Sequence, residues 1–173
     1  MIFEISKNNY KVDYLINCAG IASMNHSLLT PYSFADKILR TNFLGTFLLS
    51  REVGKMMIKH KFGRIINFSS IATIIKTEGE SVYIASKQAI ESLTKTLSFE
   101  FAPFNITVNA IAPCPMETAM ISNMDKIKLN LFIDKQTIKR FCDINDITNI
   151  TDFFIDNMSS LITGQVIYLG GVQ

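Results

Sequence analysis

The sequence predicts an α/β fold, a parallel β-sheet flanked by helices, as a single domain over residues 1–173. Short β-rich runs alternate with longer segments whose apolar residues follow helical spacing, and this alternation is typical of parallel sheets. Hydrophobic residues make up 48% of the 173 residues, which is enough for one core and argues against disorder. A Tyr83-Ile-Ala-Ser-Lys87 motif falls between one such strand and the next helix.

The N-terminal part is expected to form the tail of a helix, then a strand, then a long helix. The apolar run Val12–Ile16 predicts a strand that ends at Asn17. A long helix is expected over about 33–60, where Ser33 and Asp36 resemble a capping arrangement. Its apolar stripe is wider than one sheet face needs and consists of Ile38, Leu39, Phe43, Leu44, Phe47 and Leu48.

The middle of the chain is expected to hold two strands separated by a helix. Gly63–Ser70 reads as a short buried strand that ends in a polar turn, and Ile106–Ile111 is a second β-rich run that Pro113 stops. Between them, one apolar stripe predicts a helix with Ile90, Leu93, Leu97 and Phe101 on one face. Ser70 then lies at the carboxyl end of a strand, where open parallel sheets bind ligands.

The C-terminal part is expected to contain a loop and helix at about 117–140 and a last strand within Ile162–Gly171. The loop and helix are rich in apolar residues. These side chains suit either a lid over a substrate or a helix packed on the core; they include Met120, Met124, Leu129, Leu131 and Phe132.

The tyrosine and the lysine carry the candidate chemistry. Four residues are about one helical turn, so the Tyr83 phenol and the Lys87 ammonium project from one helix face. A tyrosine has a pKa of about 10, and a nearby ammonium favours the phenolate and lowers that pKa, which makes the phenol a usable acid or base. A hydroxyl from Ser70 can hold a carbonyl oxygen beside it. The spacing alone also fits an ordinary helix surface.

These motifs resemble the short-chain dehydrogenase/reductase family, and the similarity runs along nearly the whole chain. Ser70, Tyr83 and Lys87 match the family's serine, tyrosine and lysine in order and spacing. Thr41–Gly45 resembles the segment with the family's active-site asparagine, which would be Asn42. The strand end Asp13–Gly20 resembles the family's N-N-A-G motif, with Cys18 in place of the second asparagine.

The later part of the chain continues the resemblance. Val108–Pro113 is similar to the strand before the family's Pro-Gly turn, although Cys114 stands where glycine is usual. Ile162–Gly171 resembles the last strand, and 117–140 falls where the family has its variable substrate lid. Within the family, the chain most resembles the 3-oxoacyl-carrier-protein reductase type.

The resemblance implies a Rossmann-like fold and hydride transfer between NAD or NADP and a small carbonyl or alcohol substrate. Tyr83 would exchange the proton, Ser70 would polarise the substrate oxygen, and Lys87 would lower the tyrosine pKa and hold the nicotinamide ribose. Asn42 would support a chain of water molecules. The cofactor-binding residues that the resemblance implies are Asn17, Ala19, Gly20, Tyr83, Lys87, Pro113 and Thr118.

No G-x-x-x-G-x-G or G-x-G-x-x-G motif occurs in the sequence. The resemblance therefore predicts an N-terminally truncated sheet that keeps strands 4–7 of the family and lacks the residue that selects NAD or NADP. The strand near 12–17 would become an exposed apolar edge, which invites pairing with another chain. Two functions stay open: an oxidoreductase, or a non-catalytic subunit that pairs with a full-length relative.

The resemblance also implies a homo-oligomer that forms through the helices at about 33–60 and 84–102. A net charge of +2 gives no reason to expect nucleic acid as a partner. No apolar run is long enough for a membrane span, and the opening residues do not resemble a signal peptide, so the cytoplasm is the expected compartment. The three cysteines have neither metal-ligand spacing nor an even count for a disulfide framework.

Several of these residues have a plainer interpretation. Ser69 competes with Ser70 for the catalytic role, although the spacing to Tyr83 favours Ser70. For Asn17, the alternative to cofactor binding is a structural role in which it ties the strand end to its loop. Cys18 and Cys114 are expected to be small buried packing residues. If the turn at Cys114 needs a positive φ, cysteine pays a steric cost there that glycine would not.

Overall fold

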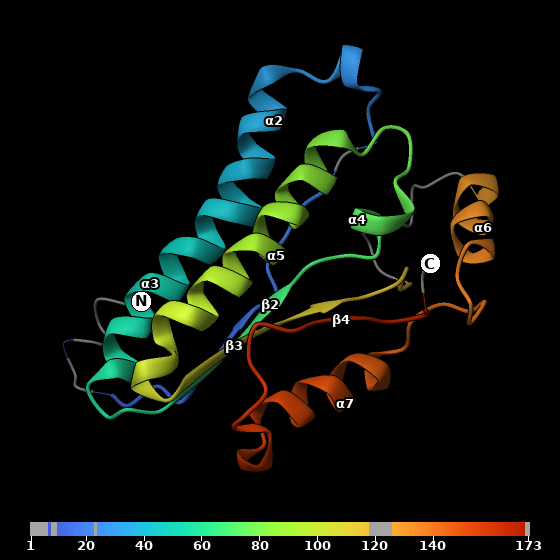
Figure 1. The fold of residues 1–173 in the computed structure, drawn as a ribbon. Coiled ribbons are helices and arrows are strands. Elements are labelled where there is room, and N and C mark those ends of the chain that lie inside the picture. Colours follow the sequence, from blue (N-terminus) through green and yellow to red (C-terminus); the bar gives the residue numbers. More distant parts are fainter. Residues whose placement is uncertain (1–6, 8–9, 23, 118–125, 172–173) are drawn as a thin grey trace.

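The computed structural model describes every residue except 1–6, 8–9, 23, 118–125 and 172–173. Its four strands form one parallel sheet in the order β1-β2-β3-β4, which confirms the predicted α/β fold (Figure 1). The strands are β1 (Tyr14–Asn17), β2 (Gly63–Phe68), β3 (Ile106–Ala112) and β4 (Val166–Tyr168).

Helices cover both faces of this sheet. The face shown uppermost in Figure 1 carries α2 (Tyr32–Ile38), the π-helix η2 (Leu39–Leu44), α3 (Gly45–Ile58) and α5 (Ser81–Phe101), and α7 (Ile144–Ile155) lies against the opposite face. The shorter elements are η1 (Ser27–Leu29), α4 (Ala72–Ile75), η3 (Ala102–Phe104), α6 (Lys126–Asp134) and η4 (Asn157–Ser159).

Successive residues of β2 belong to two different cores, because side chains alternate across a strand. Ile65 packs with Val53 and Met57 of α3, whereas Ile66 belongs to the cluster that contains Phe154 of α7. All seven residues of β3 are buried. Such continuous burial is typical of parallel strands covered on both faces, and the amides of Asn67 and Asn109 in the two central strands are hydrogen-bonded inside the protein.

The long helix expected over about 33–60 is divided into α2, η2 and α3. The expected cap at Ser33 is wrong: α2 begins at Tyr32 with Pro31 as its N-cap, and no side chain caps it. The ring of Pro31 fixes φ at −65°, and this residue takes the N-cap position two residues before Ser33. The π-helix that follows widens one turn and contains the fully buried Asn42.

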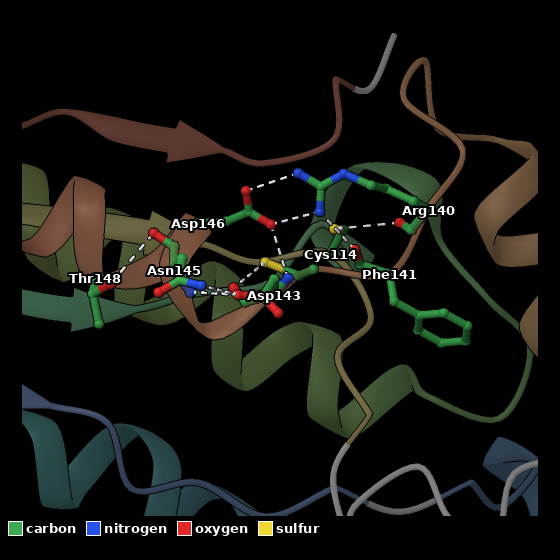
Figure 2. A network of polar contacts seen from close by, with 8 residues as sticks. Cys114, Arg140, Phe141, Asp143, Asn145, Asp146 and Thr148 are labelled. Atoms are coloured by element: carbon green, nitrogen blue, oxygen red, sulfur yellow. Dashed lines mark hydrogen bonds and ion pairs between the residues drawn. The ribbon is translucent and has the colours of Figure 1, made fainter.

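The C-terminal part contains a second helix, α7, that the sequence analysis did not anticipate. The carboxylate of Asp143 accepts a hydrogen bond from the backbone N–H of Asn145 at 2.8 Å, and the Asp146 carboxylate accepts one from the N–H of Asp143, also at 2.8 Å. The guanidinium of Arg140 donates two hydrogen bonds to Asp146 (Figure 2). Arg140 therefore holds the pKa of Asp146 at about 2.

The region expected to be a substrate lid is described only in part. Met120 and Met124 lie outside the described residues, and α6 occupies 126–134. Phe132 is buried in the same core cluster as Phe154, which favours core packing for that side chain. Within the described ranges, no helix has both the length and the apolar character needed to cross a bilayer.

Candidate active site

Tyr83 and Lys87 lie one turn apart near the start of α5, which begins at Ser81. Tyr83 is half-buried, and only 5% of Lys87 is exposed. The lysine Nζ donates a 2.8 Å hydrogen bond to the backbone oxygen of Phe68 at the end of β2. The same Nζ lies 5.8 Å from the centre of the Tyr83 ring. The helical spacing therefore brings the two side chains together, with the ammonium over the ring face.

The pKa of Tyr83 is raised, which is the opposite of the predicted direction. Burial is the largest cause, a hydrogen bond with Ser70 acts the other way, and the negative charge of Glu80 raises the pKa further. The predicted lowering by Lys87 is absent because the ammonium lies over the ring and bonds to Phe68 instead of lying beside the phenol oxygen. In this structure the phenol is held in its protonated, proton-donating form.

Lys87 has a pKa lowered to about 8, and burial of its ammonium is the main cause. A thiolate at Cys18 opposes this shift. Cys18 is exposed, which corrects the expectation that it is a buried packing residue. The lysine is therefore partly charged in the neutral to mildly alkaline range, and its charge responds to whatever anionic group lies at the end of β1.

The two serines at the end of β2 point to different partners. Ser69 is buried and donates a 2.6 Å hydrogen bond to the Glu91 carboxylate. Ser70 is half-buried, its Oγ accepts a hydrogen bond from the Ala72 N–H at 3.2 Å, and its side chain is hydrogen-bonded to Tyr83. Of the two candidates, Ser70 is the serine that the structure places beside the phenol.

The loop after β3 lies alongside the serine turn. The backbone N–H of Ser69 donates to the oxygen of Ile111 at 2.8 Å, and the N–H of Ile71 donates to the oxygen of Pro113 at 3.1 Å. These bonds extend the pairing of β2 and β3 and bring Pro113 next to the Ser70 turn. Cys114 is buried as expected, and it is not among the positive-φ residues, so it carries no such steric cost.

The side-chain amide of Asn42 holds the loop after β1 in place through hydrogen bonds. Its Oδ1 accepts from the N–H of Ile21 at 2.8 Å, and its Nδ2 donates to the oxygen of Ile21 at 2.9 Å and to Oγ of Ser86 at 3.0 Å. The Ser86 hydroxyl in turn donates to the backbone oxygen of Tyr83 at 2.7 Å. The side chain thus ties the β1 loop to α5, and the water relay that the resemblance implies stays a prediction.

The Asn17 side chain lies inside the protein. Its Nδ2 is 3.0 Å from Oγ of Ser50 and 2.9 Å from Oδ1 of Asn67, and Asn67 continues the network to Thr94. Only 5% of Asn17 is exposed. This interior position supports the plainer, structural interpretation of Asn17, because its side chain is engaged between the sheet and α3. A part for Asn17 in binding a cofactor stays a prediction.

Gly20 leaves space in front of the lysine. A Cβ built on Gly20 would lie 3.4 Å from Nζ of Lys87 and 3.5 Å from Oδ1 of Asn42. Ala19, next to it, is exposed. Because Gly20 has no side chain, none of its own atoms fills the space beside the Lys87 ammonium and the Asn42 amide. The contact of Ala19 and Gly20 with a dinucleotide stays a prediction. Thr118, the remaining predicted contact, lies outside the described residues.

The structure adds three polar residues that the sequence analysis did not select. Glu80 is buried beside Tyr83, its pKa is raised mainly by burial, and it is hydrogen-bonded to Thr77. Ser86 and Glu91 are buried on α5. In the sequence, the only indication of Glu91 is that this acidic residue directly follows Ile90, a member of the expected apolar stripe. In the described part of the chain, no cluster of three or more His, Cys, Asp or Glu residues could hold a metal ion.

The comparisons with known proteins agree with this geometry. A family model described as enoyl-(acyl carrier protein) reductase matches residues 1–172. The chain is 38% identical over 169 residues to the 3-oxoacyl-(acyl-carrier-protein) reductase of Buchnera aphidicola subsp. Baizongia pistaciae, covering 96% of this chain and 68% of the relative. It is 32% identical over 176 residues to the NAD-dependent glycerol dehydrogenase of Listeria innocua, covering 99% and 68%.

A solved structure extends the similarity to the fold. The structure of NAD⁺-bound xylitol dehydrogenase superposes with a TM-score of 0.88 at 28% identity, over 98% of this chain and 72% of that chain. The chain thus spans about two thirds of the length of the two curated relatives named above, at 68% of each.

Proposed function

The chain belongs to the short-chain dehydrogenase/reductase family, a family of NAD(P)-dependent oxidoreductases, and we propose that it interconverts a carbonyl and an alcohol with Tyr83 as acid/base. The observation that carries this proposal is the grouping of three side chains at the carboxyl ends of β2 and β3. The phenol of Tyr83 is bonded to Ser70 and lies under the ammonium of Lys87.

The raised pKa of Tyr83 keeps its phenol protonated at neutral pH. A protonated phenol can donate its proton to a developing alkoxide, which is the step that carbonyl reduction requires. The Ser70 hydroxyl lies where it can donate to the same oxygen and hold the substrate in place. Lys87 supplies positive charge next to the phenol, and its hydrogen bond to Phe68 holds it there.

NAD or NADP is the proposed cofactor, and when bound it supplies the hydride. Ala19 and Gly20 would border its nicotinamide ribose, because Gly20 leaves the approach to Lys87 open. Lys87 would donate hydrogen bonds to the ribose hydroxyls, and Pro113 would border the site from the end of β3. Thr118 is retained as a proposed contact on the family resemblance.

The first substrate to test is a 3-oxoacyl thioester, because a relative at 38% identity is named as a 3-oxoacyl-(acyl-carrier-protein) reductase. The assay follows oxidation of NADPH and, separately, NADH at 340 nm with acetoacetyl-CoA, and reduction of NAD⁺ with glycerol. We expect turnover that Tyr83→Phe reduces by about a hundredfold or more, since a positioned general acid contributes roughly that factor. Lys95→Ala, an exposed position on the same helix, is the matched control.

The proposal fails if Tyr83→Phe folds normally and retains full turnover. It also fails if the unaltered chain, shown to bind a cofactor, turns over none of these substrates or a wider panel of ketones and alcohols. Binding is followed by the fluorescence of NADH and NADPH. This measurement separates loss of the cofactor from loss of the chemistry.

For partners, we infer a second copy of this chain that docks on the α2–α5 face. Exposed apolar side chains gather there: Leu44 and Leu48 are one turn apart on consecutive helices, and Phe99 of α5 is 84% exposed. Light scattering should give a dimer or larger species, and Leu48→Lys should shift it toward the monomer.

The free thiols of Cys18, Cys114 and Cys142 suit a reducing compartment, so we place the protein in the cytoplasm.

The non-catalytic alternative rests on β1, which is the edge strand of the described sheet. Tyr14 and Ile16 on this strand are about half exposed. Such an edge offers unpaired backbone groups and apolar side chains to a complementary chain. This alternative gains support if Tyr14→Lys or Ile16→Lys abolishes association with a full-length family member while Tyr83→Phe has no effect on any measured activity.

A further inference from the structure

The carboxylate of Glu91 is buried and surrounded by hydroxyl groups. Only 6% of Glu91 is exposed, and none of the ion pairs within the described ranges includes it. Its Oε1 lies 2.6 Å from Oγ of Ser69 and 2.9 Å from Oγ1 of Thr73, and its Oε2 accepts from the Tyr168 hydroxyl at 2.8 Å. A buried carboxylate needs such partners, because removing it from water without hydrogen bonds is costly.

The three hydroxyls come from three different parts of the fold. Ser69 directly follows β2, Thr73 belongs to α4, and Tyr168 is the last residue of β4. Glu91 itself lies on α5, one turn after Lys87 and two turns after Tyr83. The carboxylate therefore joins the helix that carries the candidate acid to the turn that carries Ser70.

Two of these contacts flank Ser70 directly. Ser69 precedes it in the chain, and the Thr73 hydroxyl lies 2.8 Å from the backbone oxygen of Ser70 as well as 2.9 Å from Glu91. Without the carboxylate, the Thr73 hydroxyl loses its acceptor on α5, and the Ser69 hydroxyl keeps only a longer contact of 3.4 Å with the backbone oxygen of Lys87. The Ser70 turn would then be held against α5 by that contact, by the bond between Lys87 and Phe68, and by a 3.3 Å bond from the Gln88 amide to the backbone oxygen of Thr73.

We propose that Glu91 is a positioning residue: it fixes the Ser70 turn against α5 and so sets the place of the Ser70 hydroxyl relative to the Tyr83 phenol. It acts through Ser69 and Thr73 and touches no reacting atom. Its effect on turnover rests on the proposed function, whereas its effect on the Ser70–Tyr83 contact does not.

The test uses the full chain labelled with ¹³Cζ-tyrosine, whose NMR shift responds to hydrogen bonding of the phenol. The chain has five tyrosines, and Tyr83→Phe assigns the relevant signal. At pH 7, Ser70→Ala should move the Tyr83 signal, and Glu91→Leu should move it in the same direction. The double variant should match Ser70→Ala alone, because both changes remove one contact. Glu91→Gln, which keeps one acceptor oxygen, should lie between Glu91→Leu and the unaltered chain.

Thr94→Val is the matched control. Thr94 lies on α5 close to Glu91, is fully buried, and accepts a 2.9 Å hydrogen bond from Asn67, away from the Ser70 turn. The Thr94→Val substitution should lower the unfolding midpoint and leave the NMR signal of Tyr83 unshifted. If Glu91→Leu behaves like Thr94→Val, the proposal is overturned. If Glu91→Leu does not fold, Ser69→Ala replaces it, and an unmoved Tyr83 signal in that variant overturns the proposal equally.

Where turnover is measurable, Glu91→Leu should lower kcat by about ten- to a hundredfold, as expected for a misplaced reacting group, with a smaller change in KM. Thr94→Val should leave kcat within twofold of the unaltered chain. An unchanged kcat in a folded Glu91→Leu variant contradicts the proposal. If no substrate is turned over even by the unaltered chain, the proposed function fails, and the NMR comparison still decides the role of Glu91.

Discussion

The ammonium of Lys87 donates a 2.8 Å hydrogen bond to the backbone oxygen of Phe68, which joins α5 to the end of β2. This bond places a buried positive charge at the carboxyl ends of the strands, close to the face of the Tyr83 ring. It also explains why the lysine does not lower the tyrosine pKa in this structure. Lys87 holds α5 against the carboxyl end of β2. Its effect on the pKa of Tyr83 depends on which other group binds beside the ammonium.

The burial of Lys87 predicts a specific pH dependence of stability. Its pKa is about 8 in the folded chain and 10.5 in a model peptide. Below pH 8 the lysine is charged in both states, so its burial cost is constant. Between pH 8 and 10.5 the unfolded chain still binds a proton that the folded chain has lost, so stability rises with pH by up to about 3 kcal/mol.

Urea unfolding of the unaltered chain and of Lys87→Met across pH 7–10.5 measures this effect. The free energy of unfolding of the unaltered chain should rise relative to that of Lys87→Met as the pH increases from 8 to 10.5. Subtracting the two curves removes the titration of the other groups. A flat difference would show that the lysine keeps its ordinary pKa in the fold.

Gly20→Ala should fold normally and bind cofactor poorly. Gly20 is not among the positive-φ glycines, and its new Cβ would meet Lys87 and Asn42 at ordinary contact distances of 3.4 and 3.5 Å. The methyl group fills the approach to the ammonium, so we expect NADH and NADPH affinity to fall about tenfold or more, equivalent to about 1.4 kcal/mol. Fluorescence titration measures this loss.

Gly45→Ala is the control for this experiment. A Cβ on Gly45 would meet only the backbone oxygen of Arg40, at 3.6 Å, and the residue has helical φ and ψ. Cofactor affinity in Gly45→Ala should equal that of the unaltered chain. Equal affinity in Gly20→Ala as well would place the nicotinamide ribose elsewhere.

Asn42→Ala should destabilise the fold by about 2–4 kcal/mol, because it removes one buried and two partly buried hydrogen bonds and leaves both backbone groups of Ile21 without their Asn42 partner. Chemical denaturation measures the loss. Arg40→Ala on the same π-helix removes only an exposed ion pair with Asp36 and should leave the unfolding midpoint nearly unchanged. An equally small effect for Asn42→Ala would mean that the loop after β1 is held by other contacts.

Asp143→Ala should cost about 1 kcal/mol of stability, because it removes the side chain that caps α7. Asp143→Asn keeps an acceptor at the N-cap and should cost far less. Thermal and urea unfolding of the two variants provide the comparison. Equal losses in both would assign the effect to the charge of Asp143 and not to its cap.

The strands and the main site were predictable because they depend on local patterns. The apolar run Ile65–Ile66 needs no partner to be recognised as a buried strand, and the spacing of four residues from Tyr83 to Lys87 places both on one helix face wherever the helix lies. The family resemblance added the order of these motifs along the chain.

The features of the site that the sequence did not predict depend on contacts between distant segments of the chain. The raised pKa of Tyr83 follows from burial by surrounding elements, and the direction of the Lys87 ammonium follows from the position of Phe68. The exposure of Cys18 and the interior place of Asn17 reflect how β1 meets α3. By contrast, the sequence analysis missed α7 although its cap is a local pattern, with Asp143 and Asp146 three residues apart.

The π-helix Leu39–Leu44 holds one more residue in its turn than an α-helix would, because its hydrogen bonds close five residues apart instead of four. A deletion of one residue there can return the turn to α-helical form, so Ser50 and Val53 on α3 would keep their places against the sheet. What such a deletion would displace is Asn42, whose amide holds the loop after β1. The extra residue therefore serves the loop beside Lys87 and not the attachment of α3 to the core.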